Sequence, residues 1–236
     1  LVHEHAERSS ALERGLARFA SLSCDNLPDN GAVLRAAVLA AAERDGLGLR
    51  DWIAEGAAFP KTMVDRIVPA TDTADVQLLE RRIGLIDEAM VKAEPFSQWV
   101  IEEFAGERPD FEAAGVQVTA DVAPWEEAKL RLLNGAHSAI AYLGGLADIA
   151  FVDRFVAEPA GRAFVEALWD EAEATLAPPP GLDLAAYRDA LMRRFPNPAL
   201  QHRTRQIAMD GSQKLPQRLL APIAERLNRG EPIDAL

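Results

Sequence analysis

A lysine, an asparagine and a histidine in the segment from Pro124 to Ser138 could together carry out acid–base chemistry. A lysine amine can take a proton, and amide and imidazole groups can hold an oxygen on which negative charge develops. At about 100° per residue of an α-helix, Asn134 lies about 140° and His137 about 80° from Lys129. The spacing therefore predicts one helix face that carries these groups together with the carboxylate of Glu126.

The same spacing also fits an ordinary solvated helix face. A Glu126–Lys129 pair is common on such faces, and on spacing alone this is the more frequent meaning of the pattern. The dipeptide Asn134-Gly135, however, is a poor choice inside a helix. A helix that accepts this cost beside a histidine indicates a function.

The elements that position this helix change character along the chain. Residues after Pro124 have helical period almost to the end, broken at Pro178-Pro-Pro-Gly181 and at Phe195-Pro-Asn-Pro198. Earlier residues mix strand-like and helical patterns. We therefore expect an α/β part over residues 1–122, followed by a mainly α-helical domain over residues 123–236.

The α/β part is expected to begin with a helix over residues 3–18 and a short buried strand that ends at Cys24. A loop follows in which Asp29 or Asn30 can cap a helix. In α/β units ligands bind beyond the carboxyl ends of the strands, where Asn26 falls. The sequence further predicts a helix over 32–44 with Val33, Ala36, Ala37 and Ala40 on one side, a glycine-rich connection over 46–56, an irregular strand over 59–69, and strands at 96–102 and 116–118.

Composition argues against several classes of partner. The formal net charge is -12 and the pI about 4.8, so a nucleic-acid partner is not expected. No apolar run reaches the roughly 18 residues of a membrane span. Cys24 is the one cysteine, too few for a disulfide or a thiolate zinc site, and His3 and His5 are poorly spaced for a metal. We expect a cytoplasmic protein without a metal.

The ends of the sequence suggest a piece of a longer protein. The chain opens at Leu1 within a helical pattern and stops at Leu236 shortly after another. No glycine-rich phosphate loop is found in it. We therefore expect an internal fragment.

Three separated segments together resemble the mannitol dehydrogenase family, the polyol-specific long-chain dehydrogenases/reductases. These are Ser23-Cys-Asp-Asn-Leu-Pro-Asp-Asn-Gly31, Phe59-Pro-Lys-Thr-Met-Val-Asp-Arg-Ile-Val-Pro69 and Lys129-Leu-Arg-Leu-Leu-Asn-Gly-Ala-His-Ser138. The resemblance covers essentially the whole chain. It implies the remainder of a Rossmann-type domain followed by a helical substrate domain, and zinc-independent hydride transfer with NAD, or alternatively NADP.

The resemblance also implies roles for individual residues. Lys129 matches the general base, while Asn134 and Asn26 match the two amides that hold the substrate oxygen. His137 is expected to hydrogen-bond the reacting oxygen or a neighbouring hydroxyl. Asp65 is expected near the substrate or the nicotinamide, with Asn26 also on the cofactor side.

The base role constrains Glu126, which we take as a candidate proton relay. A free lysine titrates near pH 10.4, so a useful base requires a lower pKa. A tight pair with Glu126 would instead raise the pKa of Lys129. We therefore predict that their contact is indirect or breaks when substrate binds.

The stretch from Leu200 to Arg218 resembles the fructuronate reductase (D-mannonate oxidoreductase) branch of the family more than the mannitol branch. If the stretch were one helix, Arg203, Lys214 and Arg218 would lie within about 60° of each other. Together with Arg205 they would concentrate positive charge that suits a substrate carboxylate. The alternatives are a basic flank paired with Asp210 and Glu225, and a kink at Pro216 that spoils the stripe.

These observations leave several hypotheses open. The first is an NAD-dependent dehydrogenase that acts on D-fructuronate or D-mannonate, with mannitol 2-dehydrogenase or another polyol or tagaturonate reductase as alternatives. A second class is a non-catalytic fragment that binds sugar acid, and a third is a helical interaction domain. The expected partner is a small sugar acid or polyol, and the expected assembly is a monomer or small homo-oligomer.

Overall fold

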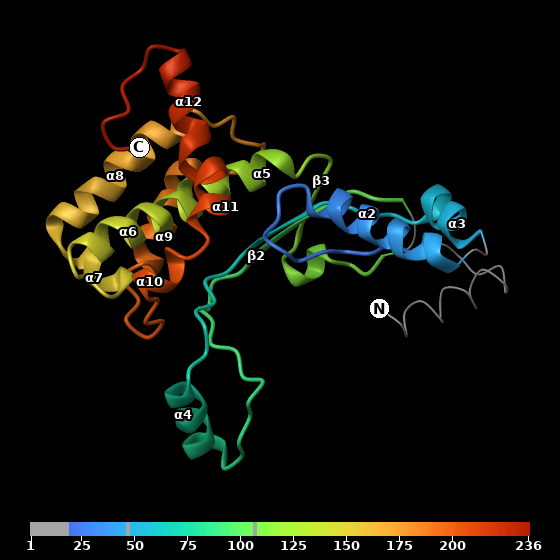
Figure 1. The fold of residues 1–236 in the computed structure, drawn as a ribbon, viewed down its shortest axis with the longest axis horizontal. Helices are drawn as coiled ribbons and strands as arrows, with labels where there is room; N and C mark the ends of the chain where they lie inside the picture. Colours follow the sequence, from blue (N-terminus) through green and yellow to red (C-terminus); the bar gives the residue numbers. More distant parts are fainter. Residues whose placement is uncertain (1–18, 46–47, 106–107) are drawn as a thin grey trace. The chain divides into compact units, whose positions relative to one another are not determined.

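The computed structural model describes residues 19–45, 48–105 and 108–236, so the helix expected over 3–18 lies outside the described residues. The chain forms two compact units. One comprises the chain up to Asp65 together with Gln98–Ala123, and the other comprises Arg66–Ser97 and Pro124–Leu236. The order of elements along the ribbon, a mixed α/β part and then helices, confirms the predicted fold class (Figure 1).

The described part of the first unit contains a sheet in the order β1-β2-β3. β1 and β2 are antiparallel, with Met63 opposite Val100, whereas β2 and β3 are parallel. The strand predicted over 59–69 shrinks to four residues, and the strands predicted near 96–102 and 116–118 are confirmed. The strands are β1 (Thr62–Asp65), β2 (Gln98–Glu102) and β3 (Gln117–Thr119).

Two of the first unit's helices pack on each other around Leu49 and Ile53, both almost fully buried. Leu49 and Ile53 are four residues apart, the spacing of one helix face. The glycine-rich connection predicted over 46–56 was therefore wrong from Leu49 onward, because Gly48 precedes this helix in the left-handed conformation and the helix begins directly after it. The helical segments are α2 (Asn30–Ala42), η1 (Glu43–Asp45), α3 (Leu49–Gly56) and η2 (Glu112–Ala114).

The predicted orientation of α2 was also wrong. Val33 is 48% exposed, and the three alanines predicted beside it are exposed as well. The partly buried side instead carries Val38 and Leu39, which pack against the core of this unit. Apolar residues occupy almost every side of this alanine-rich helix, so periodicity could not single out the packed face.

The predicted strand that ends at Cys24 is reduced to one parallel bridge between Ala20 and Ala58. The backbone N–H of Ser21 donates to Ala58, and no ladder extends beyond it toward Cys24. Cys24 is therefore exposed, and its predicted place in the core was wrong.

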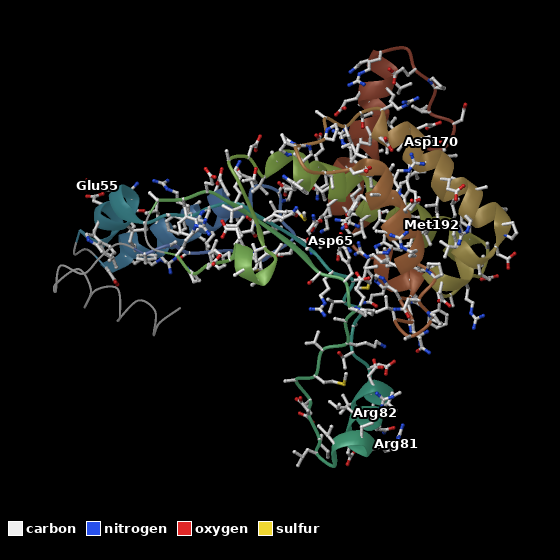
Figure 2. The ribbon with its side chains drawn as sticks, turned by 180° about the vertical axis from the view of Figure 1, so that it is seen from behind. Glu55, Asp65, Arg81, Arg82, Asp170 and Met192 are labelled. Carbon is white, nitrogen blue, oxygen red and sulfur yellow. The ribbon has the colours of Figure 1, made fainter. Side chains whose placement is uncertain are left out.

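The second unit includes an excursion from Arg66 to Ser97 that carries α4 (Thr73–Ile83), a helix that the polar sequence had left unassigned. Its N-terminus has a capping box in which Asp72 and Asp75 each bond the other's backbone N–H. Its last turn carries Arg81 and Arg82, labelled in Figure 2. None of the residues of α4 is buried. The capping box and the two arginines near the helix C-terminus stabilise it instead.

The chain after Pro124 is helical, as predicted, and the predicted breaks are confirmed between α8 and α9 and after Arg194. The elements are α5 (Ala123–Ala128), η3 (Lys129–Asn134), α6 (Gly135–Leu146), α7 (Val152–Ala157), α8 (Pro159–Glu173), α9 (Leu184–Arg194), α10 (Thr204–Ile207), α11 (Gly211–Leu215), η4 (Pro216–Leu220) and α12 (Ala221–Asn228).

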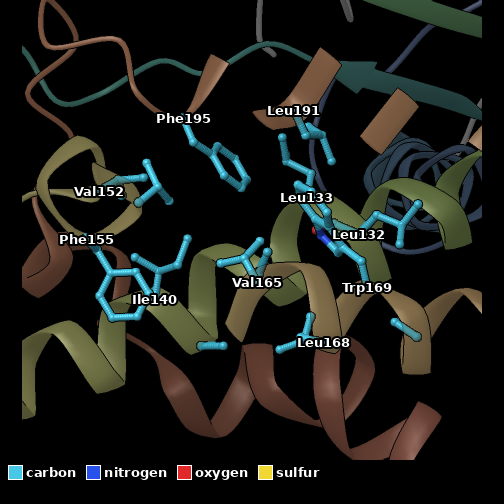
Figure 3. Packing of buried hydrophobic residues seen from close by; sticks show 14 of the residues in the cluster. Leu132, Leu133, Ile140, Val152, Phe155, Val165, Leu168, Trp169, Leu191 and Phe195 are labelled. Carbon is cyan, nitrogen blue, oxygen red and sulfur yellow. The ribbon is translucent and has the colours of Figure 1, made fainter. Parts of the chain in front are cut away.

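The core of the second unit surrounds the first half of this helical region (Figure 3). Leu132, Ile140 and Val165 are fully buried, and each contributes about 1.5–3 kcal/mol by leaving water. Phe195 and Trp169 belong to the same core, with their ring centroids 6.0 Å apart, and both are labelled in Figure 3. Among the described residues, no helix combines the length and apolarity that crossing a membrane requires.

Candidate active site

The predicted helix after Pro124 exists, but its central part is not an α-helix. Residues Lys129–Asn134 form a π-helix, η3, inserted between α5 and α6. The backbone N–H of Gly135 donates to Leu130, five residues earlier, instead of to the residue four earlier. π-Helices are rare, appear mostly as single turns inside α-helices, and are frequently found at functional sites.

The π-helix changes which side chains share a face. Each π-turn holds more residues than an α-turn, so five residues span little more than one turn and Asn134 comes closer to the line of Lys129. The angles that assumed a regular α-helix were therefore wrong across this segment. Lys129, Asn134 and His137 are 6%, 7% and 6% exposed, so the face is buried rather than solvated.

Several contacts hold η3 in place. The buried Arg131 guanidinium donates to the carbonyl of Thr175 at 2.9 Å and to the Glu225 carboxylate at 2.7 and 2.9 Å, and it also pairs with Glu127. The indole N–H of Trp169 donates to the carbonyl oxygen of Leu132 at 2.8 Å. These bonds satisfy polar groups of a segment that the core surrounds.

Gly135, at the end of η3, has a packing reason as well. A β-carbon at this position would lie 3.1 Å from the carbonyl oxygen of Arg218 and 3.6 Å from Leu219. Arg218 and Leu219 belong to η4, a second π-helix, which begins at Pro216. The glycine after Asn134 therefore lets the two π-helices approach closely, at the cost in helix propensity noted from the sequence.

Aromatic rings surround His137. Its ring centroid lies 4.8 Å from that of Phe195, which in turn contacts Trp169. The His202 ring stands nearly perpendicular to it at 5.1 Å. Among the described residues, none bonds the buried Nε2 of His137, so this ring nitrogen is available to a ligand.

The environment of His137 favours the neutral imidazole. Burial is the main cause that holds the pKa of His137 well below its usual range, followed by the charges of His202, Arg194, Arg218 and Lys129. A neutral imidazole has one donor and one acceptor nitrogen. His137 can therefore donate to an oxygen without adding a further positive charge beside Lys129.

Arg218 is the member of the basic stretch that lies near this histidine. It sits on η4, and its Nη1 donates to the Ser138 hydroxyl at 3.2 Å, one residue after His137. Its buried Nε bonds no described residue, and no described carboxylate pairs with the guanidinium. Burial lowers the pKa of Arg218, although arginine stays charged at neutral pH.

The stripe predicted from one continuous helix was wrong. The stretch is divided into α10, α11 and η4, with Asp210 in the left-handed conformation between the first two. The exposed Arg203 lies over the Phe151 ring at 5.0 Å, and the Lys214 ammonium donates to the Met209 carbonyl at 2.7 Å. Arg205 is exposed on α10. As substrate ligands, these three residues stay predictions.

Glu126 lies half-buried in α5, one turn before Lys129. This place is compatible with the predicted relay between the lysine and solvent. The relay itself, and the nature of the contact between Glu126 and Lys129, stay predictions.

Asn26 and Asp65 belong to the first unit. Asp65, labelled in Figure 2, ends β1. It is 1% exposed, whereas Asn26 lies exposed in the loop before α2. The buried Asn30 side chain fixes this loop, because it donates to Asp25 and Thr62 and accepts from the Thr62 N–H at 3.0 Å. Asn30 therefore holds the loop through these hydrogen bonds and does not cap α2.

Sequence reasoning missed several residues around His137. His202 and Phe195 contact its ring, and Glu94 holds Arg194 in a buried ion pair at 2.7 Å. Glu94 also accepts from the N–H of Ile67. His202 could have been noticed as one of four histidines in the chain, directly before Arg203. Glu94 carried no signal, because its partner lies 100 residues away.

The described residues bear on metal and cofactor binding in two places. No cluster of His, Cys, Asp or Glu among them is placed to hold a metal ion. A dinucleotide pyrophosphate requires a glycine-rich turn and a free helix N-terminus. At α2, acidic Asp29 occupies that end, and Gly31 is required by packing, since a β-carbon there would clash with the Phe59 carbonyl oxygen. This N-terminus does not fit a pyrophosphate.

The chain matches two family models, the mannitol dehydrogenase Rossmann domain over residues 5–113 and the mannitol dehydrogenase C-terminal domain over residues 121–236. Together these models cover nearly all of the sequence.

Three similar proteins illustrate the match. D-mannonate oxidoreductase of Escherichia coli (strain K12) is 49% identical over 220 residues, which are 92% of this chain and 45% of that protein. Mannitol 2-dehydrogenase of Aspergillus fumigatus (strain CBS 144.89 / FGSC A1163 / CEA10) is 41% identical over 91% of this chain and 44% of its own length. The solved mannitol 2-dehydrogenase of Pseudomonas fluorescens, a ternary complex with NAD and D-mannitol, superposes with a TM-score of 0.82 at 41% identity, over 97% of this chain and 47% of that one.

The chain thus spans about half the length of the relatives it matches. The predicted resemblance is confirmed, and both family models agree with the order of an α/β part and a helical part. This chain belongs to the mannitol dehydrogenase family.

Proposed function

We propose that this chain carries the catalytic residues of an NAD-dependent oxidoreductase that interconverts a hexuronate ketone and its alcohol, D-fructuronate and D-mannonate, with Lys129 as general base. The observation that supports this most is the buried polar face that η3 and α6 present, with Lys129, Asn134 and His137 on it. Relatives named for D-mannonate and mannitol oxidation support the same chemistry.

In the direction of alcohol oxidation, the Lys129 amine takes the hydroxyl proton of the substrate. A bound nicotinamide supplies the hydride acceptor. Asn134 and neutral His137 donate hydrogen bonds to the oxygen as negative charge develops on it, which lowers the barrier because both donors are already in place. Asn26 as second amide and Asp65 near the nicotinamide belong to this proposal through the family resemblance.

Arg218 favours a sugar acid over a neutral polyol as substrate. It is partly buried beside His137, bonds Ser138, and pairs with no carboxylate among the described residues. A partly buried guanidinium without a counter-charge is well suited to bind a carboxylate. Mannitol 2-dehydrogenase activity is the alternative, because two of the similar proteins carry that name.

The test follows nicotinamide absorbance with the intact protein and D-fructuronate, D-tagaturonate or D-fructose. Lys129→Met keeps the length of the side chain and removes the base, and we expect at least a roughly 100-fold loss of kcat. Lys92→Met, a lysine paired with Asp75 on the excursion, is the control. Preference for fructose would overturn the sugar-acid assignment, and an unimpaired Lys129→Met would overturn the base.

A non-catalytic sugar-acid-binding protein would behave differently. It would bind the sugar acid in calorimetry without any change of nicotinamide fluorescence and without turnover. That result would replace the enzyme proposal altogether.

A further inference from the structure

His202 is placed against His137 although it was not among the candidate residues. The two rings meet edge to face, with centroids 5.1 Å apart and planes at 84°. Phe195 contacts the same histidine at 4.8 Å with its ring tilted by 33°. His137 therefore packs against two rings from a different part of the second unit, and these contacts restrict how its imidazole can turn.

The backbone around His202 is held firmly. The carbonyl of His202 accepts from the N–H of Val152 at 3.1 Å, and the N–H of Thr204 donates to Ala150 at 3.0 Å. Arg203 forms an isolated antiparallel bridge with Phe151. The loop that carries His202 is thereby fastened to the start of α7.

Gln201, the residue before His202, has a φ of 48°. This left-handed conformation is uncommon for a residue other than glycine and is retained where surrounding contacts or function require it. Here it directs the chain into the bridge that positions His202. The strained backbone of Gln201 and the bridge between Arg203 and Phe151 thus both fix the position of His202.

A small cavity beside the two histidines points the same way. Its volume is about 10 Å³, and its lining includes His137, His202, Arg194 and Asn197. The volume is at the lower limit for a single water molecule, so no ligand fits here. A substrate that contacts His137 must therefore do so on another side of the ring, which leaves this side to orientation.

We propose that His202 is a positioning residue for His137, and that its ring holds the His137 imidazole against Phe195 so that Nε2 is offered to the oxygen of a bound ligand. The last part rests on the proposed function. The orientation itself does not, because it follows from contacts within the second unit.

The same contact excludes water from His137. The groups that face it are cationic or neutral, namely Lys129, Arg194, Arg218 and His202, and Arg194 is paired with Glu94. Burial is the main reason that the pKa of His137 is low, so loss of the His202 ring should let water reach the imidazole and raise that pKa toward the ordinary value near 6.5.

The experiment compares His202→Phe, which keeps an aromatic ring, with His202→Ala, which removes it. The intact protein is labelled at the histidine Cε1 carbons, and its NMR signals are titrated between about pH 8 and about pH 5.5, a window that spans the reference pKa of histidine. We expect His137 to stay neutral in the wild type and in His202→Phe, and to titrate within this window in His202→Ala. Gln206→Ala, in the next helical segment, is the control.

Enzymatic activity of the same variants is the second measurement. His202→Ala should lower kcat about 10-fold or more with little change in KM, because a misplaced donor weakens the transition state. The kcat of His202→Phe should be much closer to that of the wild type than the kcat of His202→Ala. If the alanine variant does not fold, His202→Leu takes its place, since it removes the ring with a smaller cavity.

The proposal is overturned if His137 behaves alike in the wild type and in the variant without the ring, or if His202→Phe is as impaired as His202→Ala. The titration needs no turnover. A protein in which the titration differs as expected but no sugar acid reacts would therefore refute the proposed function and leave the positioning role intact.

Discussion

The carbonyl oxygen of Arg218 lies 3.1 Å from the place that a β-carbon on Gly135 would occupy. The end of η3 thus packs against the middle of η4, and the segment with the proposed base is supported by the segment with the proposed carboxylate ligand. A single small residue determines how closely the two approach.

Gly135→Ala should therefore destabilise the protein although alanine is the better helix former. We expect a loss of about 1–3 kcal/mol, because the extra methyl group must displace backbone of η4. Gly145→Ala in the same helix meets nothing within 4 Å and should stabilise by about 0.5–1 kcal/mol. Urea unfolding of both variants measures the difference, and equal changes would show that the contact at Gly135 is unimportant.

The buried Glu94–Arg194 pair should be costly to break. Both side chains are nearly fully buried, so Glu94→Gln leaves the Arg194 charge without its partner, and we expect a loss of about 3–5 kcal/mol. The exposed Arg154, paired with Asp153 at 3.6 Å, is the matched control, and Arg154→Ala should change stability by less than about 0.5 kcal/mol. A double variant Glu94→Met with Arg194→Met that recovers most of the loss would confirm that the uncompensated charge, and not the lost volume, is responsible.

Stability should fall as the solution is acidified below about pH 6.5. Burial holds the pKa of His137 well below its usual range and lowers that of His202 to about 4. The unfolded chain then binds protons that the folded protein does not, so each histidine reduces stability by about 1.4 kcal/mol per pH unit below its unfolded pKa. Unfolding of wild type and His202→Phe between about pH 6.5 and about pH 5 should show a shallower slope in the variant. Parallel slopes would argue against a neutral, buried His202.

Arg218 should decide between acid and neutral substrates. A charge-assisted hydrogen bond contributes about 1.5–3 kcal/mol, so Arg218→Gln should raise KM for D-fructuronate about 10- to 150-fold. KM for D-fructose should stay unchanged. Lys214→Gln should have a much smaller effect, because the Met209 carbonyl already engages its ammonium. Loss of affinity for both sugars alike would indicate that Arg218 supports the fold of η4 and not the carboxylate.

The sequence predicted the elements with strong local signals. The helix after Pro124, the breaks at the proline clusters and the two strands after residue 96 all carry patterns that depend on a few neighbouring residues. The packed face of α2 could not be predicted, because alanine gives nearly the same apolar character to every side. The exposure of Cys24 depends on where pairing with Ala58 stops, which is a tertiary property.

The site was predicted in part for similar reasons. Lys129, Asn134 and His137 stood out by type and by resemblance, but the π-helix that gathers them is maintained by Trp169, Arg131 and the backbone of η4. His202 and Glu94 lie 73 and 35 residues from Lys129 in the sequence, and no periodic pattern links such positions. Tertiary contacts, not local propensity, bring them to His137.

The π-helix also sets how many residues separate the groups on its face. Because each hydrogen-bonded ring of η3 holds one residue more than that of an α-helix, five residues carry the chain little more than one turn from Lys129 to Asn134. Removing one residue between them would restore α-helical bonding, and four α-helical steps would still place the amide within about 40° of the amine. Such a deletion would therefore keep the reacting groups on one face. Its cost would instead fall on the core, because Arg131, Leu132 and Leu133 in this segment are buried.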